Sequence, residues 1–243
     1  ASLALTQNTQ PCLYVIEAIL ADLLKDKGFQ PDYVAGHSLG EYSALYAAGV
    51  FDFATGLQLV KQRSEVMAGA SGGMMAALMK FDKDHLQAAM AHNGEVVLAN
   101  DNSPEQVVIS GTVAGVEAIL ASVKARRAVP LKVSGAFHSS FMAQPSQSFA
   151  QTLETCQFND ARVPVLSNVD PNPSQNGDRL KEKLIQQMTG SVRWRETMVN
   201  LGEIGATDYW EVGPGKVLTG LCKRTCPDLN LKNIGQLEDL NSL

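Results

Sequence analysis

The sequence predicts an α/β protein with a mostly parallel sheet and an inserted subdomain of βαββαβ order. Strand-like and helix-like runs alternate over most of the 243 residues, which is typical of a parallel sheet covered by helices on both faces. After Ser71-Gly72-Gly73 the order changes to strand, helix, two strands, helix and strand. We therefore expect a core formed by residues 1–72 and 137–243, with residues 73–136 forming a small subdomain.

The first part of the chain supplies two long helices and a short strand. A helix is expected to begin near Pro11, because the fixed φ of proline suits a first turn, and to end at Gly28. A strand at 31–35 leads into Gly-His-Ser-Leu-Gly at 36–40. The next helix is expected over 51–67, with Asp52 as its N-cap. Arg63 lies one turn from apolar residues of this helix, so it need not be fully solvated.

The inserted subdomain has the split βαβ pattern of a ferredoxin-like unit. Its expected strands are 74–79, 95–100, 106–110 and 128–133, and its expected helices are 84–92 and 113–125. The chain then returns to the core. There we expect helices at 142–157, 179–188, 194–204 and 216–224, and strands at 163–168 and 209–212.

Composition excludes several classes of function. With 45% hydrophobic residues, 19% charged residues and a net charge of -5, the chain lacks the positive excess that a nucleic-acid binder needs. The four cysteines have no C-x-x-C spacing, so they predict neither a metal site nor a disulfide framework, and reduced, cytoplasmic surroundings are expected. The apolar run at 13–24 contains Glu17 and Asp22 and is too short to cross a bilayer. We therefore expect no nucleic acid, metal or membrane partner.

A serine flanked by glycines between a strand and a helix is typical of a nucleophile elbow. The sharp turn strains the serine backbone and leaves little room for side chains at Gly36 and Gly40. It also exposes the Ser38 hydroxyl and makes the N–H of Leu39 a natural donor to an oxyanion. These features predict that Ser38 is a nucleophile.

A serine hydroxyl needs a base within hydrogen-bond reach, and the chain has only four histidines. His37 is adjacent to the serine and is expected to point elsewhere. His85 and His92 fall on or beside a solvated helix of the insertion. His138 stands where the chain returns to the core and could reach the serine, although a purely structural role for it remains open.

Through five motifs the sequence resembles one family, the malonyl-CoA:acyl carrier protein transacylases of fatty acid synthesis. These motifs are Gly-His-Ser-Leu-Gly-Glu-Tyr at 36–42, Arg63 with Met67, Gly-Ala-Phe-His-Ser at 135–139, Ser-Asn-Val at 167–169 and Glu-Val-Gly-Pro-Gly-Lys-Val-Leu at 211–218. The resemblance implies a hydrolase-like α/β core with a ferredoxin-like insertion.

The resemblance also implies the roles of individual residues. Ser38 would be acylated, and His138 would act as general base and then as general acid. Arg63 would pair with the free carboxylate of the malonyl group, a role that suits a planar guanidinium. The backbone carbonyl of Gln187 would orient the histidine in place of an acid, giving a Ser-His dyad.

Other residues contribute smaller expectations. Met67 would line the acyl pocket, although it could equally be a core residue. Phe137 resembles the variant that prefers malonyl over bulkier units. Asn100 and Asn102 are expected in a solvent-exposed turn rather than at the substrate.

We therefore expect a monomeric acyltransferase that uses malonyl-CoA and acyl carrier protein, with the coenzyme A thioester as substrate and no cofactor. Carrier proteins of this kind are acidic, so a local basic patch is expected. The candidates are Lys181, Lys183, Arg193, Arg195, Lys216, Lys223 and Arg224. Three alternatives stay open: an acyltransferase domain of a polyketide or fatty acid synthase, a serine hydrolase or thioesterase of related fold, and a non-catalytic binding module.

One feature of the family has no match. Its members begin with a strand that ends in Gly-Gln-Gly-Ser-Gln, whose first glutamine supplies a second oxyanion N–H, and residues 1–35 contain no such motif. Since the sequence starts at Ala1 without methionine, an N-terminal strand is expected to be missing. Its loss would leave an unpaired sheet edge and would cost on the order of 10²–10³ in rate.

Overall fold

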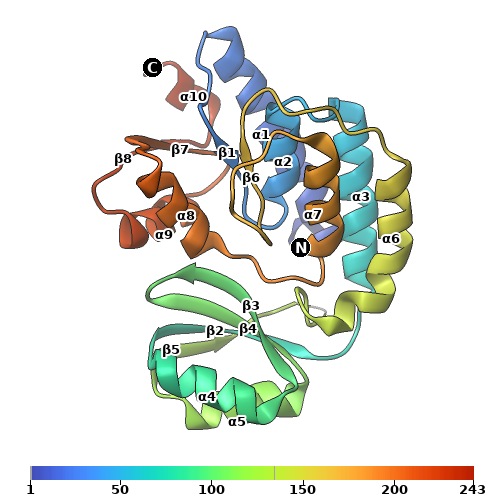
Figure 1. Cartoon of the computed structure of the whole chain (residues 1–243), viewed down its shortest axis with the longest axis vertical. Coiled ribbons are helices and arrows are strands. Elements are labelled where there is room, and N and C mark those ends of the chain that lie inside the picture. Colours follow the sequence, from blue (N-terminus) through green and yellow to red (C-terminus); the bar gives the residue numbers. More distant parts are fainter. Residues whose placement is uncertain (1, 134) are drawn as a thin grey trace.

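The computed structural model describes residues 2–133 and 135–243, which fold into an α/β core and a smaller α/β subdomain (Figure 1). Two parallel ladders lie in the core. β1 (Val34–Ala35) pairs with β6 (Val165–Leu166), and β7 (Asp208–Val212) pairs with β8 (Asn230–Ile234). A cavity of about 1590 Å³ is lined by residues of both β1 and β7.

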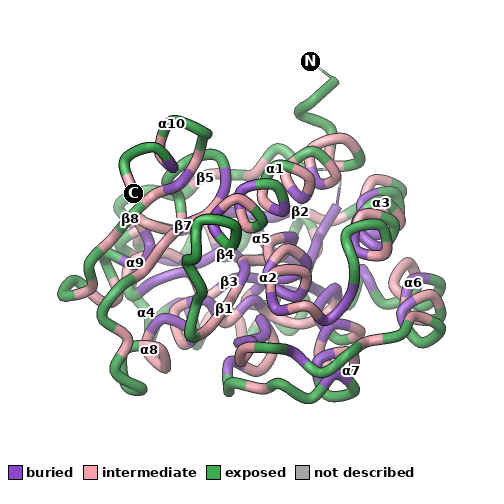
Figure 2. Tube along the Cα trace, turned by 90° about the horizontal axis from the view of Figure 1, so that it is seen from above, coloured by how far each residue is buried: buried purple, intermediate pink, exposed green. Residues whose placement is uncertain are grey.

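Helices surround these ladders, as Figure 1 shows. Those of the core are α1 (Thr6–Asp26), α2 (Gly40–Ala47), α3 (Phe53–Gly69), α6 (Ala143–Thr155), α7 (Gly177–Gln187), α8 (Trp194–Glu203), α9 (Val217–Thr225) and α10 (Leu237–Leu240), with short 3₁₀ turns η1 (Ser2–Ala4) and η2 (Ser140–Met142). The largest hydrophobic cluster includes Tyr14, Leu45, Leu59 and Val165, all fully buried or nearly so. In Figure 2, buried residues follow the inner strands and α2, whereas α10 and α6 at the periphery carry many exposed residues. No helix of the described residues is long and apolar enough to span a membrane.

The subdomain follows α3 and has the predicted order of elements. These are β2 (Met74–Phe81), α4 (Lys83–Asn93), β3 (Val96–Ser103), β4 (Gln106–Gly111), α5 (Val113–Ser122) and β5 (Ala125–Pro130). The strands form one antiparallel sheet in the order β3-β4-β2-β5. Both helices cover the same face of the sheet (Figure 1). Leu78, Ile109 and Ile119 fill the space between sheet and helices.

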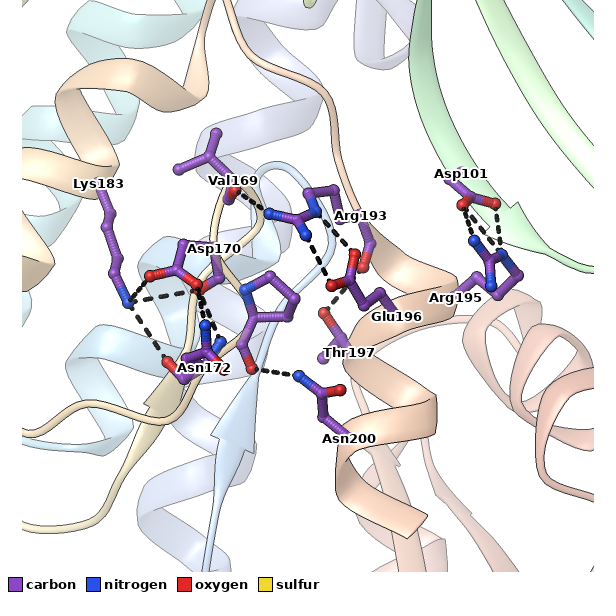
Figure 3. A network of polar contacts seen from close by, with 11 residues as sticks. Asp101, Val169, Asp170, Asn172, Lys183, Arg193, Arg195, Glu196, Thr197 and Asn200 are labelled. Atoms are coloured by element: carbon purple, nitrogen blue, oxygen red, sulfur yellow. Dashed lines mark hydrogen bonds and ion pairs between the residues drawn. The ribbon is translucent and has the colours of Figure 1, made fainter. Parts of the chain in front are cut away.

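The free edge of β3 joins the subdomain to the core. The Val192 N–H donates to the Ala99 carbonyl at 2.8 Å, and the Asp101 N–H donates to the Val192 carbonyl at 2.9 Å. Arg195 at the start of α8 donates hydrogen bonds from Nε and Nη2 to the Asp101 carboxylate, at 2.9 and 2.7 Å (Figure 3). The chain before α8 therefore extends the small sheet and fixes the position of β3 beside the core.

The structure corrects two local predictions and adds two elements. The first helix begins at Thr6, and Pro11 lies inside it. Proline has no N–H for the Gln7 carbonyl, so that oxygen lacks its usual helical donor. The Ser64 oxygen lies 3.4 Å from it, but the Ser64 hydroxyl proton goes to the Lys61 carbonyl at 2.7 Å. The strand expected at 31–35 is limited to Val34–Ala35. The sequence also gave no prediction for β8 and α10.

The prediction that Asn100 and Asn102 lie in an exposed turn is wrong. Both belong to β3, and their exposed fractions are 6% and 5%. They are buried because the chain before α8 and the elbow segment cover this edge of the sheet, which is a tertiary contact that a local polar pattern does not reveal.

Candidate active site

Ser38 lies in a tight turn between β1 and α2, and its φ of 51° falls in the left-handed region. A Cβ at Gly36 would stand 1.9 Å from the carbonyl carbon of Gly40, so only glycine fits there. A Cβ at Gly40 would have no atom within 4 Å. The steric expectation therefore holds for Gly36 and is wrong for Gly40.

Asn168, which follows β6, ties the two sides of this turn together. Its Oδ1 accepts from the Ser38 N–H at 2.7 Å, and its Nδ2 donates to the Gly36 carbonyl at 2.6 Å. Because the Ser38 N–H is engaged in this way, it is not free to bind a substrate oxygen. The N–H of Leu39 has no acceptor within the described part of the chain, which agrees with a role as oxyanion donor.

The structure brings Ser38 and His138 together. The serine Oγ lies 3.0 Å from His138 Nε2. On the other side of the ring, Nδ1 lies 3.0 Å from the carbonyl oxygen of Gln187 and 3.1 Å from that of Gly190. Since carbonyls only accept, Nδ1 must carry the proton and Nε2 is left as the acceptor for the serine hydroxyl. Two backbone carbonyls thus stand where a catalytic triad has a carboxylate.

His138 is held neutral by its surroundings. Its side chain is buried, and burial together with the positive charge of Arg63 lowers its pKa from 6.5 to about 3. A neutral imidazole is the form that can accept the serine proton. His138 is therefore ready to act as a base throughout the neutral range.

Arg63 points from α3 to the same serine, and only 1% of it is exposed. Its Nη2 donates to Ser38 Oγ at 2.9 Å and to Gln187 Oε1 at 3.1 Å, while its Nη1 donates to Gln10 Oε1 at 2.6 Å. The Tyr42 ring lies 5.5 Å from its Cζ. Burial lowers the pKa of Arg63. No carboxylate among the described residues forms an ion pair with it. Glu41 acts on Arg63 only through space, so a buried cation without a directly bound carboxylate stands beside the serine.

The sequence analysis expected only the backbone carbonyl of Gln187 in the site, but its side chain lies there as well. Besides its carbonyl contact with His138, its Nε2 donates to the Ser38 carbonyl and to Glu41 Oε2, both at 2.8 Å. Burial raises the pKa of Glu41, and its Oε2 also accepts from the Asn168 N–H at 3.2 Å. One glutamine therefore touches the serine, the histidine and the arginine, and it is buried together with Glu41 beneath the turn.

The remaining histidines do not reach the serine. His37 Nε2 lies 2.7 Å from Asn102 Oδ1 on β3, and its ring packs against Trp194 at 5.5 Å. His85 and His92 are exposed on α4. Met67 and Phe137 are both buried in the large core cluster that also contains Leu39. Their contact with an acyl group remains a prediction.

Sequence reasoning missed Gln10, the side chain of Gln187 and the support from Glu41. Glu41 and Asn168 lie inside motifs that carried the resemblance, so a signal for them existed. Gln10 had none, because its place beside Arg63 results from the packing of α1 against α3.

Three of the seven cations of the expected basic patch are neutralised by ion pairs. Lys183 pairs with Asp170, Arg193 with Glu196 and Arg195 with Asp101 (Figure 3). Lys181 donates to the carbonyl of Cys156. On and beside α9, Lys216, Lys223 and Arg224 are exposed, and within the residues that the structure describes they form no ion pair. The described residues contain no group of histidine, cysteine or acidic side chains able to hold a metal ion, and the four cysteines are free.

Known proteins resemble this chain over its whole length. Residues 1–237 match a protein family described as the acyl transferase domain. A malonyl CoA-acyl carrier protein transacylase from Synechocystis sp. is 93% identical over 243 residues, which is 100% of this chain and 83% of that protein.

Solved structures give the same result. The crystal structure of the Synechocystis malonyl-CoA:ACP transacylase matches with a TM-score of 0.98 and 92% identity, over 100% of this chain and 83% of that one. A type II PKS acyl-carrier protein in complex with its malonyl-transacylase matches with a TM-score of 0.93 and 36% identity, over 99% of this chain and 81% of that one. These similarities confirm the predicted α/β architecture.

Proposed function

The chain belongs to the acyl transferase family, and we propose on this basis that it moves a malonyl group from malonyl-CoA to the phosphopantetheine thiol of an acyl carrier protein. One observation supports this most strongly. The Ser38 hydroxyl lies 3.0 Å from the base His138 and 2.9 Å from the buried guanidinium of Arg63. A nucleophile, a base and a cation with no directly paired carboxylate in one place suit an acyl group that carries its own carboxylate.

In the first half-reaction, Ser38 Oγ attacks the thioester carbonyl carbon while its proton passes to His138 Nε2. The Leu39 N–H donates to the oxyanion that forms. The C–S bond then breaks, and the coenzyme A sulfur leaves as a thiol after taking the proton from His138. The malonyl group remains on Ser38 as an ester.

The second half-reaction runs the same steps with another thiol. His138 takes the proton of the pantetheine thiol of the carrier protein, and the sulfur attacks the ester carbonyl. The C–O bond breaks, and Ser38 recovers its proton from His138. Two transfers through one serine predict ping-pong kinetics. Coenzyme A leaves in the first transfer and the Ser38 hydroxyl in the second, so coenzyme A takes part as a product of the substrate thioester and not as a cofactor.

Arg63 gives this chemistry its preference for a dicarboxylic acyl group. Its Nε–H is buried without an acceptor in the described residues, and its Nη2 is shared between Ser38 and Gln187. A malonyl carboxylate would satisfy the free donor and supply the missing negative charge, and a desolvated charge pair of this kind discriminates strongly. An ester hydrolase has no use for such a cation.

The exposed cations near α9 are our candidates for contact with an acidic carrier protein, namely Lys216, Lys223 and Arg224. They have no acidic partner of their own among the described residues, so their charge is available. We place the reaction in the cytoplasm, because the four cysteines are all free and reducing surroundings keep thiols in this state.

The test is a transfer assay with malonyl-CoA and an acyl carrier protein that bears phosphopantetheine, followed by mass spectrometry of the carrier. We expect malonylated carrier with the wild-type protein and none with Ser38→Ala. Free malonate formed without malonylated carrier would favour a hydrolase and contradict the proposal. A Ser38→Ala variant that still transfers would remove the serine from its role.

A further inference from the structure

A buried glutamine on α1 binds the terminal nitrogen of Arg63 that does not contact the serine. Gln10 is 6% exposed, and its Oε1 accepts from Arg63 Nη1 at 2.6 Å. We propose that Gln10 is a specificity-determining positioning residue: it holds the guanidinium in place without neutralising it, so that the acyl group must supply the negative charge. This inference rests on the proposed malonyl transfer and extends it to a residue outside the catalytic turn.

The amide of Gln10 is fixed in one orientation. Its Nε2 donates to Thr6 Oγ1 at 2.7 Å and lies 3.3 Å from Met67 Sδ. Both of these neighbours can accept hydrogen bonds, and a guanidinium can only donate. The amide oxygen must therefore face Arg63 and the NH₂ group must face away, so the contact cannot be reversed by a flip of the side chain.

The packing of α1 against α3 gives this contact its register. The Ser64 hydroxyl, next to Arg63 on α3, donates to the Lys61 carbonyl of its own helix at 2.7 Å, and its oxygen lies 3.4 Å from the Gln7 carbonyl on α1. That carbonyl lacks its usual helical partner because Pro11 follows four positions later. Gln10 and Arg63 thus meet at a place where the two helices pack closely against each other.

The important property of Gln10 is that its amide is uncharged, so it binds Arg63 without cancelling the positive charge. The guanidinium is held by two amide oxygens, from Gln10 and Gln187, and by one hydroxyl. The nearby acid Glu41 accepts hydrogen bonds at its Oε2 from Gln187 and Asn168, and it acts on Arg63 only through space. A glutamate at position 10 would keep the size of the side chain and place a carboxylate on Nη1. The malonyl carboxylate would then have to compete with a partner that is already bound.

The experiment measures single-turnover acylation of the protein by malonyl-CoA and by acetyl-CoA, using mass spectrometry of the intact chain. The readout is the ratio of the two acylation rates. We expect Gln10→Glu to lower this ratio about 100-fold, which is near the upper end of what one charged hydrogen bond contributes. Gln10→Met removes the acceptor without adding a charge, and a drop of about tenfold is expected.

Three controls separate this role from a structural one. Gln7→Glu adds the same charge on an exposed position of α1 and should leave the ratio unchanged. In an Arg63→Ala background, Gln10→Glu should have no further effect on the ratio, because the residue acts through the arginine. Thermal unfolding of each variant shows whether it is folded.

The outcomes are distinct. Suppose that the wild-type protein prefers malonyl-CoA and that the rate ratio of Gln10→Glu stays within about threefold of the wild-type ratio. This result overturns the inference and leaves the proposed function intact. A drop of equal size in Gln7→Glu also overturns it. A wild-type protein that accepts neither thioester overturns the proposed function and this inference together.

Discussion

The Nη2 of Arg63 lies 2.9 Å from the Oγ of Ser38. The serine oxygen therefore accepts from a cation on one side while its own proton points to His138 on the other, at 3.0 Å. This arrangement fixes the serine side chain before any substrate arrives. It also places the positive charge next to the carbon that the serine attacks, close to where the carboxylate of a short dicarboxylic acyl group would lie.

Arg63→Ala should cost malonyl transfer far more than acetyl transfer. The reason is that only the malonyl group has a carboxylate for the buried guanidinium, and loss of a buried charged contact costs about 100-fold or more in rate. Transfer rates with the two thioesters, measured side by side, check this. Equal losses would remove Arg63 from the carboxylate role.

As the pH is lowered, the acylation rate should begin to fall only at a pH well below the ordinary pKa of histidine. Burial and Arg63 lower the pKa of His138 to about 3, so the base stays neutral as the pH falls through 6.5. A profile of single-turnover acylation between pH 5 and 8 should be nearly flat on its acid side. A decline with an apparent pKa near 6.5 would contradict a buried, desolvated base.

The same group affects the pH dependence of folding. Between about pH 3 and 6.5 the unfolded chain binds a proton at His138 that the folded protein does not. The stability that this histidine contributes is therefore complete above pH 6.5 and declines as the pH falls toward 3. Urea unfolding should show a weaker loss of stability on acidification in His138→Ala than in wild type. An identical loss in both would contradict the prediction.

Alanine at two glycines of the same turn should have effects of very different size on stability. At Gly36 a Cβ would overlap the Gly40 backbone at 1.9 Å, whereas at Gly40 it would meet nothing within 4 Å. We expect Gly36→Ala to lose at least about 3 kcal/mol of unfolding free energy or to fail to fold, and Gly40→Ala to change it by less than about 1 kcal/mol. Urea unfolding of the two variants measures this, and similar values would contradict it.

The ion pair between Asp101 and Arg195 should contribute measurably to stability. It is bidentate, with Arg195 Nε 3.0 Å from Oδ1 and Nη2 2.7 Å from Oδ2, and the Asp101 and Arg195 side chains are 17% and 33% exposed. Asp101→Asn is expected to lower the unfolding free energy by about 1 kcal/mol. Glu105→Gln is the matched control, because Glu105 and Lys80 are about half exposed and 3.7 Å apart. A loss as large in the control would show that the link between β3 and α8 is not special.

The sequence predicted what depends on local patterns. The alternation of elements, the glycine-flanked serine and the Asp52 cap could be read directly, and the structure shows Asp52 accepting from the Thr55 N–H. It could not show that Asn102 is buried against His37, because strand β3 becomes covered only when the chain before α8 packs on it.

The burial of Arg63 is a second feature that local sequence patterns could not predict. On its own helix it resembles an exposed arginine, and only the resemblance to a family placed it in the site. Its burial, and the glutamine that holds it, follow from contacts between α1, α3 and α7. Such contacts join residues that are far apart in the chain, so no spacing in the sequence reveals them.

The covalent state of Ser38 after mixing with malonyl-CoA tests the central claim most directly. The protein is quenched in acid within seconds, digested and analysed by mass spectrometry of its peptides. We predict a malonyl ester on the peptide that contains Ser38, lost on addition of acyl carrier protein and absent in His138→Ala. An unmodified Ser38, or a malonyl group found on another residue of a protein that transfers it, would contradict the proposed mechanism.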